Sequence, residues 1–230
     1  MAEKISITKD RTSRIKDVLD AEGACCVGFA NVSTLGLPVT REDPFVICFA
    51  IRYDDAIVNQ LPNDEPFLQM SSVLTDKARQ IYQVVGGLLE SWGYHHSRVP
   101  SSIRQEDFPD PGEELPQKTL ATLSGLGWIG KSTLLVSPRF GPRIRLGALL
   151  TDMPLETNTA IVQSQCGDCR ACVDACPVEA IKGNPWSQVI LRCELFDLSR
   201  CYNYLWKEKM TLGRRQTCGV CLKVCPVGQQ

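Results

Sequence analysis

The chain has 230 residues, 43% of them hydrophobic, and a formal net charge of −1 at pH 7. The length suits one large domain or two smaller ones, and the near-neutral charge argues against a nucleic-acid coat, which must neutralise many phosphates. No apolar run approaches the roughly 20 residues of a membrane span and the start lacks the apolar segment of a signal peptide, so we expect a cytoplasmic protein without membrane contact.

The part of the chain that precedes residue 160 alternates helical rhythms with short apolar runs, which predict helices and buried strands. The predicted helices cover residues 12–23, 67–93 and 117–125. The predicted strands cover residues 24–30, 45–51, 133–137 and 143–152. The last two strands are expected to pair as an antiparallel hairpin across the turn PRFGP, so the predicted fold class is α+β.

Cysteine usage changes sharply along the chain. Nine of the twelve cysteines follow residue 165, and cytoplasmic thiols stay reduced, so metal ligation explains them better than disulfides do. We therefore predict two domains, residues 1–158 and residues 159–230.

The stretch GLGWIGKS, residues 125–132, matches both a nucleotide-triphosphate loop and a dinucleotide-binding turn. Both motifs need a strand before the glycines and a helix after them. Here a predicted helix comes first, and Pro138, Gly141 and Pro142 leave no room for a helix afterwards. We reject both motifs. Two interpretations remain: a glycine turn that a ligand approaches closely, or a structural turn with Trp128 in the core.

Basic residues lie close to this turn in the sequence. Arg143 and Arg145 share one face of a predicted strand. With Lys131 they are suited to holding an anionic ligand, whereas a solvated face is the ordinary alternative for a surface arginine.

The cysteine spacings carry the strongest chemical signal. Residues 166–177 read CGDCRACVDACP, the C-x2-C-x2-C-x3-C-P pattern of iron–sulfur proteins. Three thiolates on one tight loop reach three irons of one [4Fe–4S] cluster, and the fourth Cys points to a different cluster. Residues 218–226, CGVCLKVCP, repeat the end of this pattern.

Two [4Fe–4S] clusters need eight thiolates, and the two motifs supply seven. Cys193 and Cys201 are the candidates for the eighth, and we favour Cys201. The alternative is structural zinc, which also uses C-x2-C pairs, but the C-x3-C-P endings count against it. The first predicted ligand set is Cys166, Cys169, Cys172 and Cys225. The second is Cys176, Cys201, Cys218 and Cys221.

The glycine stretch and the cysteine pattern together resemble a known family. KTLATLSGLGWIGKSTLLV, LGALLTD, CGDCRACVDACPVEAI, RCYNYL and CGVCLKVCP are similar, in this order, to epoxyqueuosine reductase and its shorter relatives. The resemblance implies a nitroreductase-like N-terminal domain that binds cobalamin, and a ferredoxin-like domain whose two clusters reduce it. RCYNYL matches the family's lone cysteine segment and supports Cys201. The expected cofactor-binding residues are Gly125, Gly127, Trp128, Gly130, Lys131, Ser132, Arg143 and Arg145.

Two departures from the family matter. The family's proton-donating Asp has no clean counterpart, and Asp110 and Glu114 are weak candidates. The helical-repeat extension that helps the family enzyme to hold tRNA is also absent, so we do not expect tRNA as substrate.

These observations predict an iron–sulfur protein that passes low-potential electrons to a cobalamin for a reductive reaction on a small molecule. Two alternatives stay open: a redox-delivery protein that reduces the corrinoid of a partner protein, or an FMN-dependent oxidoreductase. In each case the expected electron donor is a carrier such as a ferredoxin or flavodoxin. Enzymatic activity is left undecided between these hypotheses.

Overall fold

The computed structural model describes residues 2–35, 38–100, 116–212 and 217–229. The chain forms two compact units, each assembled from three segments. The first comprises Met1–Ile51, Thr75–Leu126 and Arg145–Ile161, and the second comprises Arg52–Leu74, Gly127–Ile144 and Val162–Gln230. The predicted domain boundary at residues 158 and 159 is a division along the sequence and stays a prediction.

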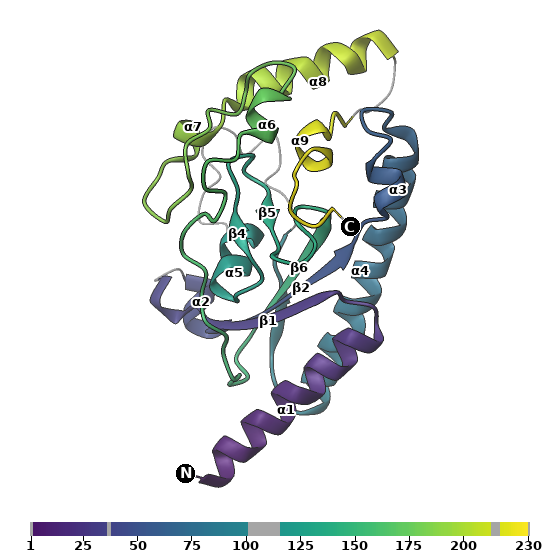
Figure 1. The fold of residues 1–230 in the computed structure, drawn as a ribbon. Coiled ribbons are helices and arrows are strands. Elements are labelled where there is room, and N and C mark those ends of the chain that lie inside the picture. The colour runs from purple at the N-terminus through teal and green to yellow at the C-terminus, as the bar shows by residue number, and fades with distance from the viewer. Residues whose placement is uncertain (1, 36–37, 101–115, 213–216, 230) are drawn as a thin grey trace. The chain divides into compact units, whose positions relative to one another are not determined.

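The first unit is built on a four-stranded sheet with the order β1-β2-β6-β3; β1, β2 and β6 are labelled in Figure 1. Its strands are β1 (Cys26–Asn31), β2 (Phe45–Arg52), β3 (His96–Arg98) and β6 (Ile144–Thr151). β1 pairs antiparallel with β2, and β3 pairs antiparallel with β6. Six consecutive residues of β2 are buried, as expected for a central strand that is covered on both faces.

Helices and a short 3₁₀ turn complete this unit. They are α1 (Ala2–Ala21), η1 (Ser33–Leu35), α2 (Pro38–Glu42), α5 (Gln117–Leu123) and most of α4 (Glu65–Ser91). Along α4 the buried side chains of Ala78, Ile81 and Val85 recur at helical spacing. Tyr82 of this helix makes an edge contact with Phe49 of β2, with ring centroids 5.3 Å apart.

The second unit contains a two-stranded sheet and several short helices. The strands are β4 (Trp128–Ile129) and β5 (Leu135–Val136). The helices are α3 (Asp55–Val58), α6 (Ala171–Asp174), α7 (Arg192–Leu195), α8 (Leu198–Leu212) and α9 (Val220–Lys223). Of the helices in the described ranges, none combines the length and apolar character that crossing a bilayer requires.

Two expectations about secondary structure are wrong. β5 pairs with β4 and not with β6, so the predicted hairpin of residues 133–137 and 143–152 does not form. The turn between them instead closes on itself through paired Ser137 and Gly141. The first helix begins at Ala2 and not at Thr12; the Thr12 hydroxyl donates to the Thr8 carbonyl inside the helix at 2.8 Å, so it is not a cap.

Candidate iron–sulfur centre

The eight predicted ligand cysteines all belong to the second unit, and six of them lie around two short helices that pack against each other, α6 and α9. The two helices carry their cysteines at matching places. Cys172 and Cys221 each lie at the second helical position, and Cys176 and Cys225 each follow two residues after the helix ends. Each helix is only one turn long. It sets Cys176 or Cys225, which follows the helix, apart from the cysteines that precede it.

The cysteine side chains influence each other electrostatically in two main groups. Cys172 interacts with Cys166, Cys169 and Cys225, and Cys225 interacts with Cys166 and Cys169. Cys221 interacts with three other thiols and also with Cys172. These three are Cys176, Cys201 and Cys218. The main groups match the two ligand sets that we predict from spacing, and the Cys172–Cys221 interaction links the groups. The assignment of each cysteine to a cluster stays a prediction.

Burial and neighbouring thiolates keep these thiols protonated when no iron is present. Burial, together with a smaller contribution from neighbouring thiolates, raises the pKa of Cys172 to about 11 and that of Cys221 to about 12. Burial likewise raises the pKa values of Cys201, Cys218 and Cys225. Iron binds the thiolate form, so loading this site must release protons and is favoured by positive charge.

Within the described ranges no three His, Cys, Asp or Glu side chains converge on a point that one ion could occupy. A zinc ion would draw its sulfur ligands to about 2.3 Å. A [4Fe–4S] cluster is a larger body than a single ion, and its four thiolate ligands lie around its periphery.

Lys131 holds the loop that carries the first cysteines. Its side chain is buried, and Nζ donates to the carbonyl oxygens of Gly167 at 2.7 Å and Cys169 at 3.0 Å. Gly167 has a φ of +50°, in the left-handed region that favours glycine. The ammonium therefore satisfies two carbonyls of a tight loop whose shape determines where Cys166 and Cys169 point.

Two N–H groups are directed at ligand sulfurs. Trp128, buried on β4, donates from Nε1 to Cys166 Sγ at 3.4 Å. The backbone N–H of Ala180 donates to Cys176 Sγ at 3.3 Å. Donors to cluster sulfurs stabilise the reduced, more negative form of a cluster and so raise its reduction potential.

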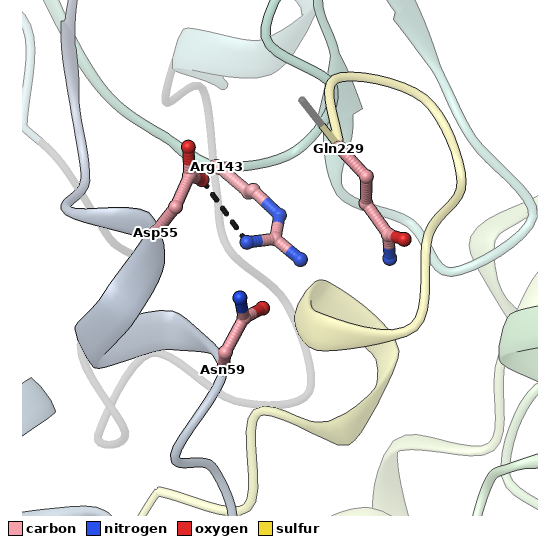
Figure 2. A pocket seen from close by; sticks show the side chains of 4 residues that line it. All are labelled: Asp55, Asn59, Arg143 and Gln229. Atoms are coloured by element: carbon pink, nitrogen blue, oxygen red, sulfur yellow. Dashed lines mark hydrogen bonds and ion pairs between the residues drawn. The ribbon is translucent and has the colours of Figure 1, made fainter.

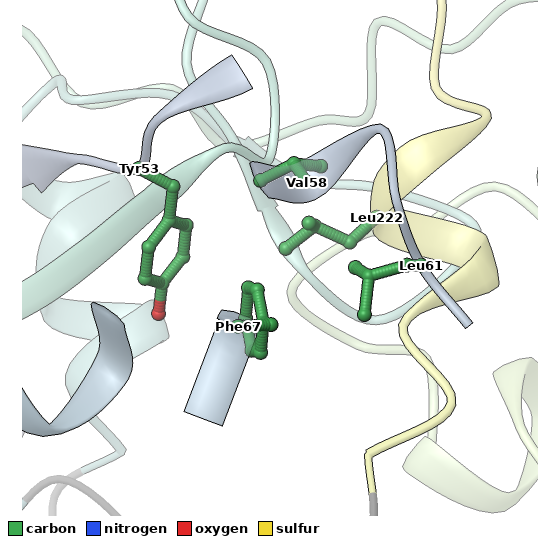
Figure 3. Close-up of a cluster of buried hydrophobic side chains, with 5 residues drawn as sticks. All are labelled: Tyr53, Val58, Leu61, Phe67 and Leu222. Carbon is green, nitrogen blue, oxygen red and sulfur yellow. The ribbon is translucent and has the colours of Figure 1, made fainter. Parts of the chain in front are cut away.

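An apolar cluster fixes α9 and with it the second cysteine motif (Figure 3). Leu222 of α9 shares this cluster with side chains from the segment between β2 and α3, from α3, from the following loop and from the start of α4. The members are Tyr53, Val58, Leu61, Phe67 and Leu222. Lys223 Nζ adds a hydrogen bond of 2.7 Å to the Leu61 carbonyl. The helix that carries Cys221 and leads to Cys225 is therefore held in place by residues that bind no iron.

The glycines of residues 125–132 are needed for close packing of the chain itself. A methyl group at Gly127 would lie 2.1 Å from the carbonyl oxygen of Val136 on β5. One at Gly130 would lie 2.8 Å from Val136 Cγ2, and Gly125 has a φ of +73° beside the Thr159 carbonyl. Trp128 is buried in the core, as the interpretation of this stretch as a structural turn predicts. Chain packing thus accounts for these glycines, and their contact with a cofactor stays a prediction.

Comparison with known proteins assigns the region around the cysteines. Residues 165–228 match the 4Fe-4S double cluster binding domain. An epoxyqueuosine reductase of Aliivibrio fischeri is 32% identical over 158 residues, which cover 64% of this chain and 40% of that protein. The chain thus resembles the epoxyqueuosine reductases and contains the 4Fe-4S double cluster binding domain. The resemblance that the sequence motifs suggest is thereby confirmed, and so is the double-cluster domain.

Solved structures extend the likeness of this epoxyqueuosine reductase-like chain over nearly its whole length. A reductive dehalogenase structure that suggests a mechanism for B12-dependent dehalogenation matches with a TM-score of 0.73 at 17% identity, covering 97% of this chain and 32% of that one. Epoxyqueuosine reductase from Streptococcus thermophilus matches with a TM-score of 0.60 at 20% identity, covering 94% of this chain and 66% of that one. At these identities the likeness establishes the fold. The α+β class with a C-terminal double-cluster domain is confirmed, and the nitroreductase-like assignment stays a prediction.

The epoxyqueuosine reductase-like chain is short beside its relatives. It spans 40% of the Aliivibrio fischeri protein and 49% of the related Vibrio cholerae epoxyqueuosine reductase, about half or less in each case. The activity of those longer proteins therefore bears on this chain only as a proposal.

The remaining predicted site residues fall in different surroundings. Arg143 is 2% exposed, so it does not lie on a solvated face. It belongs to the second unit and is paired with Asp55, whereas Arg145, at the start of β6, belongs to the first unit and is half-buried. Ser132 is buried. Asp110 and Glu114 lie outside the described residues.

Sequence reasoning missed the acidic partner of Arg143. Asp55 follows the end of β2 and accepts hydrogen bonds from Arg143 Nη1, at 3.0 Å, and from Arg52. Partial burial raises the pKa of Asp55, but the hydrogen bonds and charges of Arg143 and Arg52 outweigh it and hold the pKa below its ordinary value. Arg143 lies 88 positions from Asp55 in the sequence, so no local signal identifies this pair.

Proposed function

We propose that this epoxyqueuosine reductase-like protein transfers electrons, one at a time, through two [4Fe–4S] clusters to a cobalamin, for a reductive reaction on a small molecule. The observation that carries the proposal is the division of eight cysteines into two adjoining groups of four. Each group joins cysteines of one C-x2-C motif to the last cysteine of the other motif. Two clusters held in this way lie next to each other, and electrons can pass between them.

The donor set fits iron–sulfur clusters. Each proposed cluster has four thiols, Lys131 supports one ligand loop, and Trp128 and Ala180 direct N–H groups at sulfur atoms. The chain's own residues thus hold the clusters, orient their ligands and lower the cost of adding an electron to each cluster.

The support for cobalamin is of a different kind. It comes from the fold shared with a B12-dependent reductive dehalogenase and from the relation to epoxyqueuosine reductases. The glycines of residues 125–132 pack closely against other parts of the chain, and the Lys131 side chain already donates a hydrogen bond to the cysteine loop. When bound, cobalamin would supply a strongly reducing, nucleophilic metal centre.

A second candidate function is electron delivery to the corrinoid of a partner protein. The sequence motifs favour it in one respect, because the proton-donating Asp of the epoxyqueuosine reductases has no clean counterpart in this chain. FMN in place of cobalamin is the third candidate. In all three cases we propose a low-potential donor such as a ferredoxin or flavodoxin, and we do not propose tRNA as the substrate.

Anaerobic purification with iron, sulfide and cobalt analysis tests the proposal. We expect about eight irons per chain from two [4Fe–4S] clusters. After reduction, added cobalamin should bind at one equivalent and change its visible spectrum, whereas FMN should not bind. Iron near eight without cobalamin binding would leave electron delivery to a partner, FMN binding would favour the flavin candidate, and zinc in place of iron would overturn all three.

A further inference from the structure

A polar pocket of about 310 Å³ lies in the second unit, lined by Asp55, Asn59, Arg143 and Gln229 (Figure 2). Asp55 and Asn59 belong to α3 and its C-terminal end, Arg143 directly precedes β6, and Gln229 lies near the end of the chain. Figure 2 shows the four side chains facing one another around a common space. None of these residues is a predicted cluster ligand.

The guanidinium of Arg143 dominates the pocket. It donates from Nη1 to Asp55 Oδ1 at 3.0 Å and from Nη2 to the Lys223 carbonyl at 2.9 Å. A guanidinium has five N–H donors, and the buried Nε has no acceptor among the described residues. A buried, hydrogen-bonded arginine with donor capacity to spare is poised to bind an anion.

The local charge balance is also positive. Arg52 and Arg143 both pair with Asp55, so two cations face one carboxylate. One net positive charge matches a carboxylate better than a phosphate group, which carries close to two negative charges at neutral pH. The carboxamides of Asn59 and Gln229 can donate further N–H groups to a carboxylate oxygen.

We propose that this pocket binds a small carboxylate-bearing molecule on Arg143, with Asn59 and Gln229 at its rim. The pocket is also connected through the backbone to Cys225, a predicted cluster ligand. The Lys223 carbonyl, which accepts from both Arg143 and Gln229, lies two residues before Cys225. A carboxylate on Arg143 therefore places negative charge near the cluster that includes Cys225 and lowers its reduction potential.

Calorimetric titration of the anaerobic, cluster-loaded protein with acetate and succinate tests the binding, at constant ionic strength in chloride. Two variants add a negative charge at the exposed rim without disturbing the core: Asn59→Asp and Gln229→Glu. We expect each to weaken binding at least tenfold. The matched control is Gln60→Glu, which makes the same charge change on an exposed residue that does not line the pocket. It should stay within twofold of the natural protein.

Other outcomes would contradict the binding site, the ligand class or the coupling to the cluster. Absence of saturable heat with either probe, or equal weakening in Gln60→Glu, overturns the site. Tighter binding of inorganic phosphate than of either carboxylate overturns the ligand class. A redox titration of the clusters with and without saturating succinate tests the coupling, where a lower potential is expected and no change would overturn the coupling alone. The binding measurement does not depend on cobalamin, so its failure is distinguishable from failure of the proposed function.

Discussion

Lys131 Nζ lies 2.7 Å from the carbonyl oxygen of Gly167 and so joins the turn after β4 to the first cysteine loop, 36 positions along the chain. A buried ammonium that serves two carbonyls of a loop is expected to stabilise the shape of that loop more than an exposed lysine could. The contact gives Lys131 a structural role beside the cluster ligands that does not require a bound cofactor.

Replacing Lys131 by Met should therefore lower the free energy of unfolding by about 2 kcal/mol, the usual cost of losing hydrogen bonds to a charged group. We also expect faster loss of iron on exposure to air, measured from the decay of the iron–sulfur absorption. Lys16→Met makes the same change at an exposed position on α1 and should alter neither quantity. Equal behaviour of the two variants would contradict the role assigned to Lys131.

Cys201 and Cys193 offer a direct test of the eighth ligand. Cys201 lies on α8 and interacts with Cys176 and Cys218, whereas Cys193 is an exposed residue of α7. Cys201→Ser should reduce the iron content from about eight to about four per chain, because one [4Fe–4S] cluster loses a thiolate. Cys193→Ser should keep about eight. Iron loss in the Cys193 variant alone would reverse the assignment.

Leu222→Ala removes the apolar contact that fixes α9. Because Leu222 is almost fully buried in its cluster, we expect a loss of about 3 kcal/mol in the free energy of unfolding, within the range for buried leucines. Denaturant titration under anaerobic conditions measures it. Val189→Ala, at a position that is 90% exposed, should change the free energy by less than about 0.5 kcal/mol.

Two glycine substitutions should have opposite effects. At Gly127 a methyl group meets the Val136 carbonyl at 2.1 Å, so Gly127→Ala must displace backbone and should destabilise the protein by about 2 kcal/mol or more. Gly87 lies inside α4 with open space around it, and Gly87→Ala should stabilise by about 0.5–1 kcal/mol through helix propensity. Thermal melts of both variants measure the difference, and a tolerated Gly127→Ala would refute the packing argument.

His95 should make stability depend on pH. Its Nδ1 lies 2.9 Å from Oδ1 of buried Asp43, and this hydrogen bond, together with the charge of Asp43, raises the pKa of His95 above 6.5. A raised pKa means that the stabilisation is fully present below about pH 6.5 and is lost as the pH rises through the folded-state value.

His95→Gln should accordingly be less stable than the natural protein at pH 6, by less than about 1 kcal/mol because the imidazole is largely exposed. The two proteins should converge at pH 9. Denaturation curves at both pH values measure this. A difference that grows towards pH 9 would show that the ion pair does not stabilise the fold.

The cysteine motifs show which properties of the protein follow from short stretches of sequence alone. C-x2-C-x2-C-x3-C-P encodes iron–sulfur chemistry because its first three thiolates share one loop, so the spacing of a few residues already limits their geometry. The buried strand β2 and the rhythm of α4 were likewise predictable, because continuous apolar runs and helical periodicity follow from burial within a single element. The α+β class follows from the same patterns.

By itself, then, the sequence determined the iron–sulfur chemistry, the α+β class and the family. Only the tertiary structure decided that β5 pairs with β4, that Lys131 binds the cysteine loop, and that Arg143 is buried against Asp55. Each of these contacts joins segments whose partner could not be chosen from local preference, because strand pairing, ion pairing and burial depend on which segments the whole fold brings together.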